Sequence, residues 1–381
     1  MNTITKESFS NIPSILRACL AAALVSSASV SAQTYTVTPI NPPAGTDSCV
    51  AQSLNNLGGV VGYTRVKAGK NYALGPAFIW KSGQSTTLMP LSGQPSAEAT
   101  RISDSGLIVG GPNLLSNLET GRATWWEKTS TGYQPRDWNA LLPAGSGLTL
   151  LRADALSHDG RYISFQAEIG ATGLRDIVAE IELDSTGPLP LGIVRYWDVT
   201  DVWGVTDIHH DGAGLVRATG LGGPDVDTPG AFLWVKSPDG TTQLIDRHSS
   251  ADQVTGAWAV NGLGELAGFR RNSSVDRAVY WDQSGIMQDI GTLGGSEAVA
   301  NSINDGDYVV GWALTARRNA PSHAFLWHSS TGMRDLNVLK STTDTSGVEL
   351  TSAAKINNAG QILALGASKS LGNVAVLLNP Q

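Results

Sequence analysis

The chain has 381 residues, of which 41% are hydrophobic and 15% are charged, and its net charge is −7. This balance excludes an intrinsically disordered chain, which would combine few apolar residues with a high net charge. It also argues against a nucleic-acid partner, because neutralising phosphate groups needs a basic surface. The 43 glycines indicate a fold with many tight turns.

The first segment, residues 1–32, has the pattern of a secretory signal peptide. Lys6 and Arg17 supply positive charge, residues 18–25 form an apolar run, and residues 30–32 form a small-residue cleavage site. The apolar run is too short to span a bilayer, and no later segment is long and apolar enough to do so. We therefore predict an exported protein, periplasmic or extracellular, without membrane attachment after cleavage.

The cysteine content indicates how the mature chain is stabilised. Cleavage of the signal peptide leaves Cys49 as the single cysteine, so no internal disulfide can form. Stability must then come from burial of apolar surface, although the compartment is oxidising. A single thiol of this kind is more often a small buried residue than a nucleophile, so we favour a structural role for Cys49.

A nine-residue module recurs seven times along the mature chain. It consists of an apolar residue, Asn or a small polar residue, two variable residues, Gly, one variable residue, two apolar residues, and Gly or a small residue. The copies begin near residues 54, 102, 156, 208, 260, 303 and 356. Asn, Asp and Ser bond to their own turn backbone, and Gly supplies the positive φ of a tight reversal. Each copy therefore predicts a β-hairpin.

A second module, an apolar run with Ala first and Trp last, follows most of the hairpins. Its copies are residues 77–80, 123–126, 231–234, 278–281 and 324–327. Runs that are apolar on successive residues are typical of strands packed on both faces. A fourth strand follows in several units, and four short strands per unit of about fifty residues match a β-propeller blade. We predict one all-β domain over residues 33–381, a seven-bladed β-propeller with four-stranded blades.

The two ends of the mature chain are complementary. The last unit lacks a fourth strand, and an unassigned segment at residues 35–40 has alternating strand character. We predict that this N-terminal strand pairs into the last blade and closes the ring. Such pairing also covers a sheet edge that would otherwise be open to aggregation.

Four segments of the sixth unit carry a family resemblance. They read Ile-Asn at residues 303–304, Val-Val-Gly at 309–311, His-Ala-Phe-Leu-Trp at 323–327 and Gly-Met-Arg-Asp-Leu at 332–336. This series resembles the probable extracellular repeats called the HAF family, and the resemblance extends more weakly over most of the mature chain. It implies secretion and a bacterial origin, and it transfers no catalytic residue.

The loops between the second and third strands of each blade share one face with the links between blades. These loops are long and variable, and loops of this kind carry function more often than the scaffold does. Arginine forks match carboxylates bidentately, so an acidic polysaccharide is a candidate ligand. The alternative interpretation is that these arginines are solvated loop residues. The candidate ligand-binding residues are Arg65, Arg270, Arg271, Trp312, Arg317 and Arg318.

Histidines and acidic residues are interpreted mainly as scaffold. His209 and His210 fall in the asparagine slot and the next slot of the fourth hairpin module, and His323 precedes a core strand. We therefore expect all three to be structural. An acid/base set would form only if the ring brought four residues together, namely Glu168, Asp176, His248 and Asp252.

Three functions remain open from these patterns. The first is a non-catalytic secreted propeller, a monomer that binds a glycan or a cell-surface protein on the variable-loop face. The second is a polysaccharide lyase or hydrolase, which would need a His or Tyr, an Arg and a carboxylate to converge over the channel. The third is a surface-assembly module, which would need an exposed apolar patch. No nucleophile elbow, zinc motif or phosphate loop occurs, so we favour binding and expect no metal or cofactor.

Overall fold

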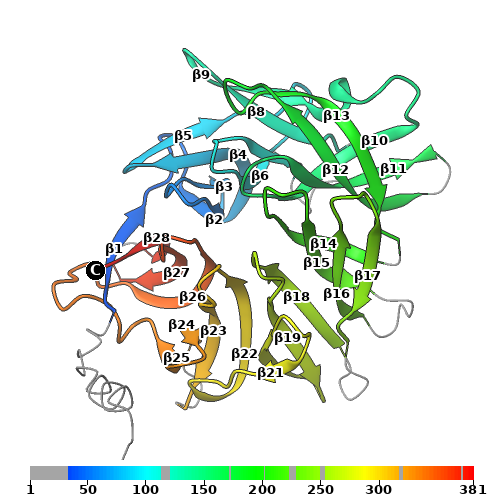
Figure 1. Cartoon of the computed structure of the whole chain (residues 1–381). Helices are drawn as coiled ribbons and strands as arrows, with labels where there is room; N and C mark the ends of the chain where they lie inside the picture. The colour runs from blue at the N-terminus through cyan, green and yellow to red at the C-terminus, as the bar shows by residue number, and fades with distance from the viewer. Residues whose placement is uncertain are drawn as a thin grey trace, which may run out of the picture. The chain divides into compact units, whose positions relative to one another are not determined.

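The strands of the computed structural model form seven four-stranded antiparallel sheets arranged in a ring, so the chain is a seven-bladed β-propeller (Figure 1). The structure describes residues 33–112, 121–170, 173–200, 202–222, 229–248, 254–316, 321–369 and 372–381. Residues 34–381 form one compact unit. Among the described residues, no helix has the length and apolar character needed to cross a membrane.

The first four blades follow one another along the chain. Blade 1 contains β2 (Ser48–Leu54), β3 (Val60–Ala68), β4 (Asn71–Lys81) and β5 (Gln84–Leu88). Blade 2 contains β6 (Glu98–Ile102), β7 (Ile108–Gly111), β8 (Thr124–Thr129) and β9 (Gly132–Asp137), and a short 3-10 helix, η3 (Trp138–Leu141), follows it. Blade 3 contains β10 (Leu148–Leu156), β11 (Tyr162–Ile169), β12 (Leu174–Leu183) and β13 (Pro190–Asp198). Blade 4 contains β14 (Val202–His210), β15 (Val216–Gly222), β16 (Gly230–Lys236) and β17 (Thr242–Asp246).

The last three blades complete the ring. Blade 5 contains β18 (Val254–Val260), β19 (Leu266–Asn272), β20 (Val275–Trp281) and β21 (Met287–Asp289). Blade 6 contains β22 (Gly294–Ile303), β23 (Val309–Thr315), β24 (His323–His328) and β25 (Gly332–Asp335). Blade 7 contains β26 (Glu349–Ile356), β27 (Ile362–Ser368), β28 (Gly372–Pro380) and β1 (Tyr35–Ile40). The first strands of neighbouring blades contact one another, so these seven strands surround the axis of the ring.

The third strand of each blade is apolar on successive residues because it packs against two neighbouring blades. In β4, Ala77 and Ile79 join a core cluster with residues of blade 2, whereas Phe78 and Trp80 join a cluster with residues of blade 7. All four side chains are buried. Side chains alternate between the two faces of a strand, so a strand buried on both faces needs a continuous apolar run.

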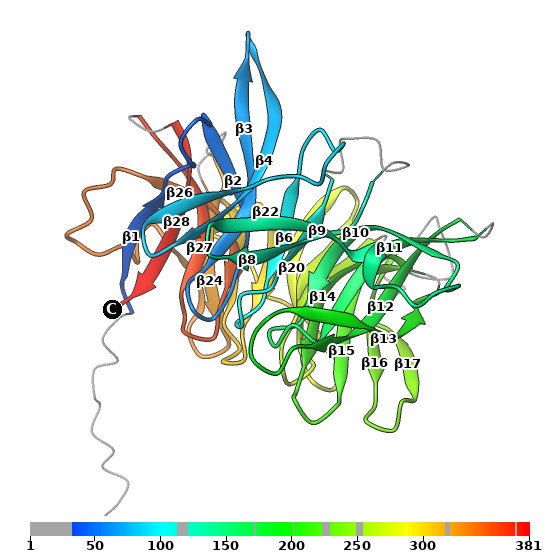
Figure 2. The same ribbon diagram turned by 90° about the horizontal axis from the view of Figure 1, so that it is seen from above.

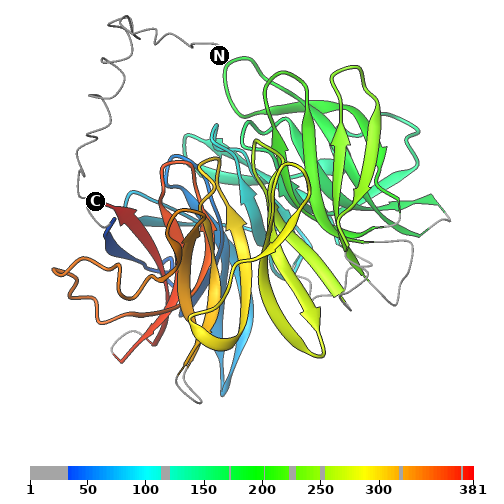
Figure 3. The ribbon, with the colours of Figure 1, turned by 60° about the horizontal axis from the view of Figure 1, so that its bottom comes forward.

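The N-terminal strand closes the ring, as the sequence predicts. β1 pairs with β28 in antiparallel register from Tyr35 opposite Pro380 to Ile40 opposite Ala375, and Figure 3 shows β1 in dark blue beside β28 in red. Tyr35 and Ile40 are each 1% exposed and lie in two different core clusters. β1 therefore supplies both backbone pairing and apolar contact to blade 7.

Hydrogen bonds between hairpin turns link neighbouring blades. The Oδ1 atom of Asn55 accepts from the backbone N–H groups of Leu57 and Gly59 in its own turn, and its Nδ2 donates to Ser103 O of blade 2 at 2.8 Å. The same donation runs from Asn357 to Asn55 O at 2.9 Å and from Asn304 to Asn357 O at 3.0 Å. Asn261 continues the series by donating to Asn304 O at 3.2 Å. Each asparagine thus stabilises its own turn and joins it to the next blade.

The fourth hairpin module begins two residues later than the sequence pattern predicts. Asp211 takes the asparagine slot, because its Oδ1 accepts from Ala213 N and Leu215 N at the spacings seen for Asn55. Gly214, with φ +100°, supplies the left-handed residue of this turn. The assignment of His209 and His210 to the turn is therefore wrong, since both residues lie in β14.

Cys49 lies partly buried in β2, where its Sγ faces Ile40 O of β1 at 3.7 Å. Burial raises the pKa of the thiol to about 11. The thiol is therefore protonated at neutral pH and a poor nucleophile, which supports a structural role.

Deleting residues 33–41 removes β1, and we expect the free energy of unfolding to fall by about 5 kcal/mol through lost pairing and lost burial of Tyr35 and Ile40. Thermal unfolding followed by circular dichroism measures the change. The protein that begins at residue 33 is the control. An unchanged melting temperature would refute closure by β1.

The variant Asn357→Ala removes the amide that bridges two hairpin turns. Its free energy of unfolding should be lower by about 2 kcal/mol, because the turn loses its cap and Asn55 O loses its donor. The matched control is Asn373→Ala, an exposed asparagine in β28, which should change stability by less than about 0.5 kcal/mol. Chemical denaturation compares the two variants. Equal stabilities would show that the bonds between turns contribute nothing.

Candidate functional site

A β-bulge occurs at the equivalent place in each of the seven innermost strands. The register shifts lie between Ala51 and Ser53 in blade 1 and at the matching positions of the other blades. A bulge inserts one unpaired residue and re-aims its side chain. The inserted residues are Gln52, Thr100, Asp154, Thr206, Trp258, Asn301 and Ala354.

The bulges build a cavity, here called the upper cavity, of about 340 Å³ in the channel. Six of the seven inserted residues line it, all except Ala354. Innermost strands run from the links between blades toward the hairpin turns, and most of the inserted residues lie two residues before the last residue of the strand. The upper cavity is also lined by Arg101, Arg152, Gln166 and Lys355.

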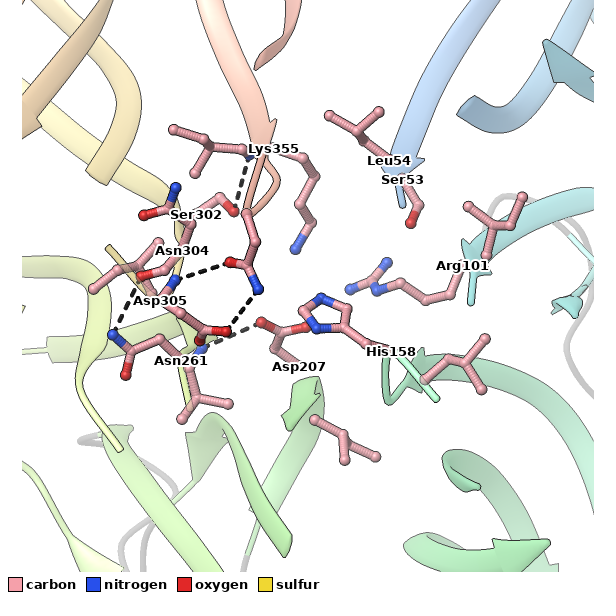
Figure 4. Close-up of a pocket in the computed structure, with 17 residues that line it drawn as sticks. Ser53, Leu54, Arg101, His158, Asp207, Asn261, Ser302, Asn304, Asp305 and Lys355 are labelled. Atoms are coloured by element: carbon pink, nitrogen blue, oxygen red, sulfur yellow. Dashed lines mark hydrogen bonds between the residues drawn. The ribbon is translucent and has the colours of Figure 1, made fainter. Parts of the chain in front are cut away.

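A second, smaller cavity, here called the lower cavity, has a volume of about 40 Å³ and lies where the innermost strands end at the hairpin turns. Figure 4 shows Lys355, Arg101, His158 and Asp207 pointing into its shared space. A cavity of this size holds a few water molecules. Arg101 and Lys355 line both cavities and so lie between them.

Arg152 is buried in the wall of the upper cavity between two carboxylates. Its Nη1 lies 3.1 Å from Glu98 Oε2, and its Nε lies 2.6 Å from Asp154 Oδ1. Gln52 Nε2 also donates to Glu98. Burial raises the pKa of Glu98, and the charge of Arg152 opposes that rise. The positive charge of Arg152 is therefore matched by its immediate neighbours.

The positive charges of Arg101 and Lys355 are less completely balanced by neighbouring carboxylates. Arg101 donates to Thr100 O at 2.8 Å and, across the channel, to Thr206 O, while its buried Nε has no partner among the described residues. Lys355 Nζ makes no hydrogen bond or ion pair with any residue the structure describes. Burial lowers the pKa of Lys355 to about 8, with Asp207 opposing the change and Arg101 adding to it. Two cationic donors thus face the cavity.

Two buried acceptors near the upper cavity also lack partners within the described part of the chain. Gln166 Oε1 belongs to a residue of the cavity wall, and Asp176 Oδ1 lies on the neighbouring strand, opposite Gln166. Burial raises the pKa of Asp176 to about 7, and Asp154 adds to this rise. Unpartnered buried polar atoms are rare in proteins, and several at one cavity indicate a place for water or a polar ligand.

The arginines selected from the sequence lie away from both cavities where they are described. Arg271 forms two hydrogen bonds with Asp276 at 2.6 and 2.8 Å, and Arg270 Nη2 lies 3.2 Å from Asp289. Arg65 lies on the hairpin of β3 and β4, which projects beyond the other blades in Figure 2, and it contacts Tyr63. Ligand binding by these three residues stays a prediction.

The remaining residues of that set are split between the described and undescribed parts of the chain. Trp312 is half-buried in β23, opposite Val299 and Ala324, rather than at the entry to a loop. Arg317 and Arg318 lie outside the described residues. Trp312 lines neither cavity.

The histidines have structural contacts. His323 Nδ1 lies 2.6 Å from Asp335 in its own blade, and its Nε2 lies 3.1 Å from Glu349 of blade 7. His210 Nδ1 lies 2.6 Å from Asp159 of blade 3, and so joins blades 3 and 4. These contacts support the structural interpretation of His323.

The three described members of the acid/base set do not form a cluster. Glu168 and Asp176 lie on the neighbouring strands β11 and β12, but His248 contacts Asp246 and Thr255 of blades 4 and 5. Asp252 lies outside the described residues.

Sequence reasoning missed the residues that line the channel. Arg101 and Lys355 each directly precede the apolar residue that starts a hairpin module, a position occupied by Ser or Ala in most other copies. A long cationic side chain at a position that is otherwise small was the sequence feature that could have revealed these channel residues. Trp258 carried no such signal, because it stands at a bulge that a regular strand pattern does not reveal.

A second group of charged residues outside the two cavities is a pair of carboxyl groups where blades 5 and 6 meet. Asp307 takes the glycine position of its hairpin turn with φ +59°, and its side chain hydrogen-bonds to Glu265. Asn261 Nδ2 donates to Glu265 at 2.7 Å and to Asp307 at 3.4 Å. The hydrogen bond with Glu265 and burial raise the pKa of Asp307 to about 6, so the pair holds one proton below that pH.

Comparisons with known proteins support the fold. Neither a model of a known protein family nor a curated protein matches the chain. The β-propeller domain of the Trilobed protease from Pyrococcus furiosus is similar, with a TM-score of 0.51 and 10% identity over 88% of this chain and 97% of that chain. An oligogalacturonate lyase from Vibrio parahaemolyticus has a TM-score of 0.47 and 10% identity over 91% of this chain and 97% of that chain. The Pyrococcus domain has an open velcro topology, whereas here β1 closes the ring.

The variant Asp307→Asn should be more stable than the parent protein at pH 7 by about 1 kcal/mol, after allowing for solvent screening. A carboxyl group whose pKa is raised on folding stabilises the fold below its unfolded pKa and loses that contribution as the pH rises through about 6. The asparagine amide keeps a donor toward Glu265 at every pH. Denaturation at pH 5 and pH 7 tests this, and an equal difference at both values would contradict it.

Proposed function

We propose that this protein is an exported, non-catalytic β-propeller that binds a saccharide in the upper cavity. The observation that carries the proposal is the cavity itself, about 340 Å³ in volume, with the aromatic ring of Trp258 and the polar side chains of Gln52 and Asn301 in its wall. Ligand pockets begin at about 300 Å³ and combine a few placed polar groups with apolar surface.

The chemistry of the wall favours a sugar among polar ligands. Trp258 stacks on Phe269 with ring centroids 5.5 Å apart and an interplanar angle of 22°, and this contact holds the indole at the cavity. An aromatic ring held in this way offers a flat apolar surface, and nearby amides exchange hydrogen bonds with hydroxyl groups. Gln52, Gln166 and Asn301 supply such amides.

The lower cavity supports binding over catalysis. His158, Arg101 and Asp207 all line it, and these are the residue types that a polysaccharide lyase or hydrolase would need. However, about 40 Å³ does not admit a sugar ring, and none of the three side chains hydrogen-bonds to another. A substrate in the upper cavity would meet cations, amides and one carboxylate, that of Asp154, which Arg152 already holds at 2.6 Å.

The variant Trp258→Ala should weaken saccharide binding about tenfold, because the sugar loses its stacking surface. Isothermal titration of residues 33–381 with a panel of neutral and acidic oligosaccharides measures affinity. Leu57→Ala is the control, since this apolar side chain is 63% exposed on the face of the hairpin turns.

Chromatography of the same incubations detects cleavage. Shortened products would replace the binding proposal with the enzymatic alternative. Failure of every oligosaccharide to bind the parent protein would refute the proposal and favour a protein partner.

A further inference from the structure

The wall of the upper cavity carries an excess of positive charge. Its lining includes Arg101, Arg152 and Lys355 against one carboxylate, Asp154. Arg152 is already held by Asp154 and by Glu98 behind it. Arg101 and Lys355 remain, and neither forms an ion pair with a described residue.

Arg101 and Lys355 share one counter-charge, Asp207. Asp207 interacts electrostatically with both of them, but it lines the lower cavity and accepts a backbone hydrogen bond from Val260 N at 3.2 Å. Asp154 and Glu98 also act on Arg101, so Lys355 is the cation that depends on Asp207 alone. Lys355 also lines the upper cavity, and its Nζ makes no hydrogen bond or ion pair with a described residue.

The guanidinium of Arg101 is held in place without using all its donors. Its Nη1 and Nη2 atoms donate to the carbonyl oxygens of Thr100 and Thr206, which come from blades 2 and 4. The group is therefore preorganised across the channel, and these two bonds use only two of its five N–H donors. A neutral hydroxyl could accept a bond from another donor, but a carboxylate would accept it and also balance charge in a partly desolvated site.

We propose, resting on saccharide binding in the upper cavity, that the ligand is an acidic saccharide whose carboxylate lies between Lys355 and Arg101. Lys355 is the specificity-determining residue, because it offers an unpaired ammonium to the ligand. Arg101 positions the carboxylate with a directed N–H group.

Protonation of Lys355 makes the preference dependent on pH. The group is positively charged below about pH 8 and neutral above it, so its attraction for a carboxylate is lost as the pH rises through that value. The other charged and titratable groups that line the two cavities are Arg101, Arg152, Asp154, His158, Asp207 and Asp305.

The test compares trigalacturonate with galactotriose, its neutral counterpart, by isothermal titration against residues 33–381. At pH 7 the acidic trisaccharide should bind about tenfold more tightly, and the preference should decline by pH 9. Lys355→Met should abolish the preference by lowering the affinity for trigalacturonate to about that for galactotriose. Lys355→Arg should retain the preference at pH 7 and also at pH 9, because arginine stays protonated.

The outcomes separate this inference from the proposed function. Equal binding of the two trisaccharides by the parent protein, or a preference that persists in Lys355→Met, would overturn the acidic ligand and leave saccharide binding intact. If neither trisaccharide bound, both the acidic ligand and the proposed saccharide binding would be refuted. Circular dichroism of each variant verifies folding, which we expect to be kept because methionine removes a buried charge.

Discussion

The hydrogen bonds from one hairpin turn to the next are the interaction on which the remaining structure depends. Asn261, Asn304, Asn357 and Asn55 each stabilise a turn with Oδ1 and reach the following blade with Nδ2. All four are buried. A buried amide left without these bonds would be costly, so the blades can stack only in the register that satisfies them. That register sets where the innermost strands of blades 5, 6, 7, 1 and 2 stand around the channel.

The channel chemistry follows from that placement together with the bulges. Regular strands would present the same small residues to the axis in every blade. The extra residue in each innermost strand instead aims Gln52, Trp258 and Asn301 into the upper cavity. Because of these bulges, the blades of a repetitive fold contribute different residues to one site. Gln52, Trp258 and Asn301 belong to none of the core clusters between blades, so function can be added at these positions with little cost to that packing.

Most of the fold was predictable from particular residues, whereas the site was not. The spacing of Asn and Gly marks the hairpins, the Ala and Trp runs mark the third strands, and the alternation at residues 35–40 marks the closing strand. The fourth hairpin was misplaced because Ile208 and His209 imitate the start of the module. Arg270 and Arg271 attracted attention as a pair, but two aspartates contact them.

The sequence by itself determined the number of blades, the four-stranded unit and the closure by β1, because these depend on local turn chemistry and on the periodicity of apolar residues. Only the tertiary structure decided which polar residues share the channel. Arg101, Thr206, Trp258 and Lys355 belong to four different blades, and their convergence arises from ring closure and from bulges. No local sequence pattern shows which of these side chains meet, because the separation between them is set by whole blades rather than by a turn or a strand.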